Sequence, residues 1–130
     1  MLVIDDNTAL AEGIGQGLTL AGYAVHTAYR ADVALEIAIT HRPDAIILDF
    51  NLPFINGVGF LYRLRDVLAL QRTPVLVITG EALDEETQNA IHALDGRLRY
   101  KPISLQDLIH ETRTMVECAC YNQSPLAHLQ

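Results

Sequence analysis

The sequence predicts a doubly wound α/β domain, and three observations indicate this fold class. Short apolar runs at residues 1–4, 45–48 and 75–78 each end in a polar residue, and runs of this length are typical of strands buried on both faces of a parallel sheet. Segments with helical spacing of apolar residues separate these runs. The 130 residues, of which 50% are hydrophobic, suffice for one core but not comfortably for two.

Two weaker strands complete the predicted sheet. Residues 23–28 and 97–100 alternate apolar and polar side chains, and the alternate arginines Arg97 and Arg99 suit a strand at a sheet edge. Because two more polar strands then flank three apolar ones, the predicted order of strands across the sheet is 2-1-3-4-5.

Five helices are expected, and capping residues set their ends. Asn7 or Thr8 begins the first helix and Gly22 ends it, Pro43 stops the second, and a capping box starts the last at Ser104. The expected helices lie between residues 8 and 21, 31 and 40, 57 and 70, 84 and 94, and 105 and 116. Residues expected on their apolar faces include Leu10, Ile14, Leu18, Val33, Ile37 and Leu68.

Residues 1–117 are therefore expected to form one domain, and residues 118–130 a partly disordered C-terminal tail. The net charge of −7, from 16 acidic and 9 basic residues, argues against direct nucleic-acid binding and against a basic membrane-binding patch. No apolar run approaches the roughly 20 residues of a membrane span. Cys118 and Cys120 lie close together near the C-terminus and cannot staple a fold whose body lies upstream of them, and a cytoplasmic location is expected.

The candidate functional residues are the polar side chains that follow the predicted strands. Carboxyl ends of parallel strands meet at one edge of the sheet, where ligands bind in such folds. The residues expected there are Asp5, Asp6, Asp49, Thr79 and Lys101. Each alone is more often a cap or turn residue, but five chemically complementary side chains at successive strand ends favour a site.

Elementary electrostatics indicates what this site holds. Two carboxylates about 4 Å apart repel by roughly 4 kcal/mol at an effective dielectric constant of about 20, so they need a cation or protons. Oxygen ligands without nearby His or Cys favour Mg²⁺. Asp49 follows the central strand and is the natural nucleophile, with Lys101 and Thr79 placed to hold phosphoryl oxygens. The pattern predicts phosphoryl transfer.

In combination these motifs resemble the receiver domain of two-component response regulators, over essentially residues 1–117. The resemblance rests on Asp5-Asp6, on the run from Asp49 to Pro53 followed by Gly57, on Thr79-Gly80 and on Lys101-Pro102. It implies a flavodoxin-like (βα)5 fold, a three-layer sandwich around a five-stranded parallel sheet.

The resemblance also implies a role for each site residue. Asp49 would accept a phosphoryl group from a phosphohistidine on a histidine kinase or phosphotransfer protein. Asp6, Asp49 and the backbone carbonyl of Asn51 would bind Mg²⁺ directly, and Asp5 mainly through water. Lys101 would pair with Asp49 and then with the phosphoryl oxygens.

The remaining implied features concern the loops after the last two strands. Thr79 would hydrogen-bond the phosphoryl group, Gly80 would leave room for access, and the peptide bond before Pro102 would be cis. Receivers commonly carry an aromatic residue three positions before the lysine, where this chain has Leu98. Whether the Thr79 switch works without that aromatic residue is left open, and Tyr100 is expected to pack on the last helix.

The signal would pass by conformational change to a partner or to an output domain outside this chain. The face formed by the fourth helix, fifth strand and fifth helix would carry it and would also serve a homodimer. The chain would catalyse only its own phosphorylation and slow dephosphorylation, and would not otherwise be an enzyme. The cognate kinase, the pathway and the oligomeric state stay open.

Two other functions fit parts of the pattern. An Mg²⁺-dependent phosphohydrolase with an aspartyl-phosphate intermediate would need a second aspartate two residues after the nucleophile, where Asn51 cannot transfer protons. A receiver-like interaction module that no longer uses phosphate is disfavoured by the intact acidic set and slightly favoured by Leu98.

Overall fold

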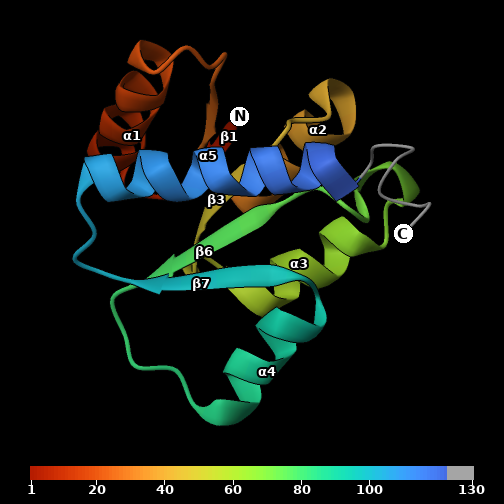
Figure 1. Ribbon diagram of the computed structural model, residues 1–130. Helices are drawn as coiled ribbons and strands as arrows, with labels where there is room; N and C mark the ends of the chain where they lie inside the picture. The colour runs from red at the N-terminus through yellow and green to blue at the C-terminus, as the bar shows by residue number, and fades with distance from the viewer. Residues whose placement is uncertain (123–130) are drawn as a thin grey trace.

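A computed structural model describes residues 1–122 and confirms the predicted fold class (Figure 1). Five parallel strands form one sheet in the order β2-β1-β3-β6-β7, which is the predicted order 2-1-3-4-5 when these strands are counted along the chain. The strands are β1 Leu2–Ile4, β2 His26–Ala28, β3 Ile46–Asp49, β6 Val75–Thr79 and β7 Gly96–Tyr100. The sequence did not predict a small antiparallel hairpin of β4 Asn51–Leu52 and β5 Ile55–Asn56.

The five helices begin close to the expected residues but differ in where they end. They are α1 Thr8–Leu20, α2 Ala31–His41, α3 Gly57–Arg65, α4 Glu85–Ala93 and α5 Leu105–Asn122. Asn7, Asn56 and Asp84 accept backbone hydrogen bonds as N-caps of α1, α3 and α4. The last helix runs beyond the expected domain end at 117 to Asn122, and the rest of the expected tail lies outside the described residues.

Helix α3 is shorter than the expected helix through residue 70. The extended backbone of Val67 separates α3 from a 3₁₀ turn, Leu68–Leu70. This break turns Leu70 fully into the core and leaves Leu68 82% exposed, so the expected apolar face does not continue through Leu68. The turn brings the chain to the start of β6. The sheet requires this change of direction, and the helical spacing of nearby apolar residues does not predict it.

Two apolar layers cover the sheet, one on each face. Strand residues on one face pack with Ala11, Ile14 and Leu18 of α1 and with Leu108 and Met115 of α5. The other face packs against α2, α3 and α4. The two layers make the expected three-layer sandwich.

Close packing selects small residues on two of the helices. A Cβ atom at Gly17 would lie 2.7 Å from the Leu105 side chain, so this glycine permits the contact between α1 and α5. Helix α2 buries Ala34 and Ala38 against the sheet, whereas Val33, expected on that face, is 41% exposed. The apolar residues have helical spacing, but α2 packs on the sheet through Ala34 and Ala38 rather than through Val33.

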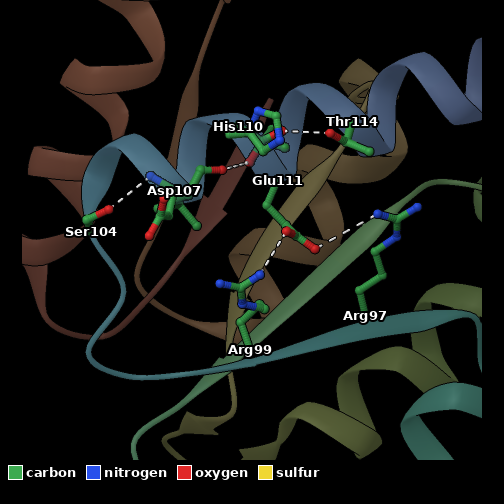
Figure 2. Close-up of polar contacts among 9 residues, drawn as sticks. Arg97, Arg99, Ser104, Asp107, His110, Glu111 and Thr114 are labelled. Atoms are coloured by element: carbon green, nitrogen blue, oxygen red, sulfur yellow. Dashed lines mark hydrogen bonds and ion pairs between the residues drawn. The ribbon is translucent and has the colours of Figure 1, made fainter.

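Ion pairs join the edge strand β7 to α5. Figure 2 shows Arg97 and Arg99 directed at Glu111, with N–O distances of 4.0 and 3.0 Å. Because alternate residues of a strand face opposite sides, Leu98 and Tyr100 lie on the other face from Glu111, and Leu98 packs there on the apolar layer that includes Ile91 of α4. The expectation that Tyr100 packs on the last helix is therefore wrong; its side chain is 44% exposed.

Helix α5 starts at a side-chain cap, where Ser104 Oγ accepts a hydrogen bond from the Asp107 backbone N–H at 3.0 Å (Figure 2). Its amphipathic character is that of a helix packed on a sheet. Within residues 1–122, the structure contains no helix with the length and apolarity needed to cross a membrane.

Candidate functional site

Three carboxylates converge at the carboxyl ends of β1 and β3. These strands are hydrogen-bonded neighbours, with Ile4 opposite Leu48, so the residues that follow them come together. One carboxylate oxygen from each of Asp5, Asp6 and Asp49 lies within 4.8 Å of the other two. Asp5 and Asp49 are buried, at 5% and 8% exposure, and Asp6 is exposed.

The protein compensates these buried charges only in part. Burial raises the pKa of Asp5, and the neighbouring Asp49 and Asp6 charges add to this effect. A hydrogen bond of 2.9 Å from the Asn7 backbone N–H to Asp5 Oδ1 opposes it. Burial likewise raises the pKa of Asp49 against the lowering effect of Lys101, the only lysine of the chain.

Lys101 is held next to Asp49 by the end of the sheet. Its backbone N–H donates to the Thr79 carbonyl at 2.8 Å, and its Nζ donates to Asp49 Oδ1 at 3.4 Å. The peptide bond between Lys101 and Pro102 is cis, as the resemblance implies. The lysine side chain keeps 35% of its surface exposed, so it can reach both the carboxylate and a group entering from solvent.

Thr79 is fully buried, and its hydroxyl is engaged by its own loop. The hydroxyl accepts a hydrogen bond from the Glu81 backbone N–H at 3.1 Å and donates to the Glu81 carbonyl at 3.4 Å. To contact a group on Asp49, it would have to exchange these local bonds. A Cβ atom at Gly80 would meet only Lys101 Cδ, at 3.8 Å, so the space beside this loop is open.

The donor set fits a hard divalent cation. All three acidic side chains offer oxygen atoms, and their spacing is compatible with ligands at about 2.0–2.1 Å from one Mg²⁺ ion, some of them through water. The Asn51 backbone N–H lies close enough to Asp49 to lower its pKa, which places the start of β4 beside the carboxylate. A cation here would neutralise charges that the protein leaves uncompensated.

Sequence reasoning missed an apolar cavity that opens beside these carboxylates. It has a volume of about 520 Å³ and reaches from Asp5, Asp49 and Lys101 into the gap between α1 and α5. Its apolar walls include Leu10 and Leu105, which are 39% and 44% exposed although they begin amphipathic helices. The sequence signal for this cavity is Leu10, an apolar residue near the start of the first helix and only a few positions after Asp5 and Asp6.

Comparison with known proteins assigns the chain to a family. It matches the response regulator receiver domain over residues 1–113 and belongs to this family. It is therefore a receiver domain of two-component response regulators, the class that the fold and the motifs predict.

The transcriptional regulatory protein PrrA of Mycobacterium tuberculosis is 31% identical over 117 residues, covering 89% of this chain and 49% of that protein. The response regulator MprA of a Mycobacterium species (strain KMS) is 28% identical, over 96% of this chain and 54% of that protein. The chain thus spans about half the length of these curated relatives.

Solved structures agree in fold. The chemotaxis protein CheY4 of Vibrio cholerae superposes with a TM-score of 0.81 at 29% identity, over 88% of this chain and 95% of that one. A CheY-like receiver domain from Methanospirillum hungatei has a TM-score of 0.83 at 22% identity, over 91% of this chain and 93% of that one, and its likeness concerns the fold alone.

Proposed function

We propose that Asp49 is the phosphoacceptor of this receiver domain. One observation carries the proposal: the oxygens of Asp5, Asp6 and Asp49 converge within 4.8 Å, and Lys101 Nζ lies 3.4 Å from Asp49 Oδ1. Among the three carboxylates, Asp49 alone has a lysine partner, and it ends the central strand of the sheet. A nucleophile between a cation site and an ammonium group suits attack on a phosphoryl group.

The donor is a phosphohistidine carried by a histidine kinase or a phosphotransfer protein. An Asp49 carboxylate oxygen attacks phosphorus and forms a new P–O bond, while the P–N bond breaks and its electron pair stays on the imidazole. The departing imidazole takes up a proton from solvent. Lys101 balances the negative charge on the acceptor before transfer and on the phosphoryl oxygens afterwards.

Mg²⁺ would be held by Asp6, Asp49 and the Asn51 backbone carbonyl, with Asp5 bound mainly through water. When bound, it supplies positive charge against the carboxylates and the phosphoryl oxygens. The hydrogen bond from the Asn7 backbone N–H helps to position Asp5 Oδ1. Cation binding and phosphorylation are then both favoured by the same partly compensated negative charge of the carboxylate cluster.

Thr79 is the second phosphoryl ligand, and its movement starts the output. Its hydroxyl leaves the Glu81 backbone to bond the phosphoryl oxygen, which pulls on the loop between β6 and α4. Leu98, where many receivers have an aromatic residue, is partly buried in the core beneath α4. We therefore assign the transmitted change to the loop rather than to a side-chain rotation at position 98.

The changed surface is the face of α4, β7 and α5, which would contact an output partner or a second copy in a homodimer. A cytoplasmic location goes with a kinase partner of this kind. The chain acts as a signalling domain that turns over only its own phosphoryl group. Hydrolysis of external phosphate esters is disfavoured because Asn51, two residues after Asp49, has an amide side chain that cannot act as a general acid or base.

The test is labelling with radioactive acetyl phosphate in the presence and absence of Mg²⁺. We expect stoichiometric, Mg²⁺-dependent labelling of the wild type and its loss in Asp49→Asn. Asp66→Asn, an exposed aspartate at the end of α3, is the matched control and should label normally. Multiple-turnover hydrolysis of small phosphate esters would instead favour the phosphohydrolase, and absence of both labelling and hydrolysis the phosphate-independent module.

A further inference from the structure

Phe54 combines full exposure with a backbone conformation that disfavours it. Its relative exposure is 107%, the highest of the large apolar residues in the described chain, and its φ angle is +69°. An aromatic residue in the left-handed region is uncommon and costs conformational energy. The fold thus carries a penalty at Phe54 and gains no packing from its side chain.

The strain comes from a tight turn that favours another residue type. Pro53 and Phe54 form the two-residue connection between β4 and β5, in which Asn51 pairs with Asn56 and Leu52 with Ile55. Proline followed by a left-handed residue is the pattern of a type II turn, whose third position favours glycine or asparagine. Leu52 is buried and Ile55 packs on the core, so both ends of the turn are fixed.

The turn follows the carboxyl end of β3, the strand that ends in the proposed phosphoacceptor Asp49. Strand β4 begins two residues after Asp49, and β5 leads into α3 on the face covered by α2, α3 and α4. The apolar cavity opens on the opposite face, between α1 and α5. Apolar surface is therefore presented on both sides of the carboxylate cluster.

We propose that Phe54 is a docking residue for the phosphohistidine-bearing protein, an inference that rests on the proposed function of Asp49. Asp49 is 8% exposed, so a macromolecular donor must cover the edge of the sheet to reach it. An exposed aromatic side chain contributes large contact area there and loses little conformational freedom on binding. A small donor such as acetyl phosphate needs no such contact.

The experiment compares the two donors on Phe54→Gly. The protein donor is the autophosphorylated histidine kinase that transfers fastest to the wild-type chain in a purified panel. Loss of one interface contact of this kind should slow transfer by roughly tenfold at sub-saturating receiver concentration. Labelling by acetyl phosphate should be unchanged, and the melting temperature should be equal or higher, because glycine suits the left-handed turn.

Controls separate docking from other effects. Phe54→Tyr keeps the aromatic ring and should transfer nearly as fast as the wild type. Leu20→Ser removes an apolar side chain that is 90% exposed at the far end of α1 and should leave transfer unchanged.

Two results would overturn the inference. One is transfer from the kinase to Phe54→Gly at the wild-type rate, and the other is a slowing by the same factor as acetyl phosphate labelling. In a panel without any transferring kinase, the docking role and the kinase partner both fail, whereas acetyl phosphate labelling would still support Asp49 as the acceptor.

Discussion

The two ends of the sheet differ in how many hydrogen-bond partners the protein provides for a buried charge. At the amino end, the Arg65 guanidinium donates to the carbonyls of Leu94, Leu70 and Thr73 at 2.9, 2.8 and 2.7 Å. At the carboxyl end, Asp49 receives one lysine hydrogen bond, at 3.4 Å, and lies among two further carboxylates. One charge joins three segments, and the other is left short of partners.

The difference separates a structural charge from a functional one. Burial lowers the pKa of Arg65 and raises those of Asp5 and Asp49, so both ends bear a desolvation cost. Arg65 offsets this cost within the protein by donating to the carbonyls that follow α4, end the 3₁₀ turn and precede β6. For the carboxylates, the remaining desolvation cost and mutual repulsion are offset only when an external cation or phosphoryl group binds. Relief of this cost then contributes to the free energy of binding.

The largest expected effect comes from breaking the structural side of this comparison. Arg65→Ala leaves three carbonyl groups without their partner and should lower the free energy of unfolding by about 3 kcal/mol. Arg65→Lys keeps the charge but not the planar fork and should lose less. Urea denaturation at neutral pH measures both, and an unchanged midpoint for Arg65→Ala would contradict the assigned role.

Removing a negative charge at the carboxyl end of the sheet should change the free energy of unfolding in the opposite direction. Asp49→Asn relieves the repulsion with Asp5 and Asp6 and should raise the free energy of unfolding by about 1 kcal/mol in Mg²⁺-free buffer at neutral pH. The same denaturation experiment measures it. A destabilised Asp49→Asn would show that the Lys101 ion pair outweighs the repulsion and that the carboxylate cluster is structural.

The pH dependence sharpens the comparison with a smaller effect. The pKa of Asp5 is raised in the folded protein, so between its ordinary value of 3.8 and the raised value the folded state binds more protons than the unfolded state. Its contribution to the free energy of unfolding therefore falls as pH rises through this window. The stability advantage of Asp5→Asn over the wild type should grow as the pH rises above 3.8 in Mg²⁺-free buffer, and level off once the pH exceeds the raised pKa. An advantage that shrinks with pH would contradict the sign.

Local sequence patterns predicted the sheet and the polar edge because both depend on runs a few residues long. An apolar run followed by Asp49 or Thr79 places that residue at a strand end whatever its neighbours do. The end of α3 at Arg65 was not predictable in this way, because the carbonyls that Arg65 bonds come from segments up to 29 residues away. The direction of Tyr100 likewise depends on which face of β7 receives Glu111.

The hairpin at Pro53 and Phe54 shows a different kind of failure. Its turn residues break the local preference for glycine or asparagine at a left-handed position, so turn preferences alone do not indicate paired strands there. The α1–α5 cavity was missed because Leu10 and Leu105 satisfy helical periodicity without being buried. In both places the sequence departs from what folding alone would favour, next to the candidate site.

The central claim is that the partly compensated carboxylate of Asp49 receives the phosphoryl group. Borohydride reduces an acyl phosphate and converts the modified aspartate to homoserine, which marks the site permanently. After treatment with acetyl phosphate and Mg²⁺ and reduction, peptide mass spectrometry should find homoserine at position 49, and Mg²⁺ chelation should abolish it. Homoserine at Asp5 or Asp6 instead, or none under conditions that modify a known receiver, would contradict the account.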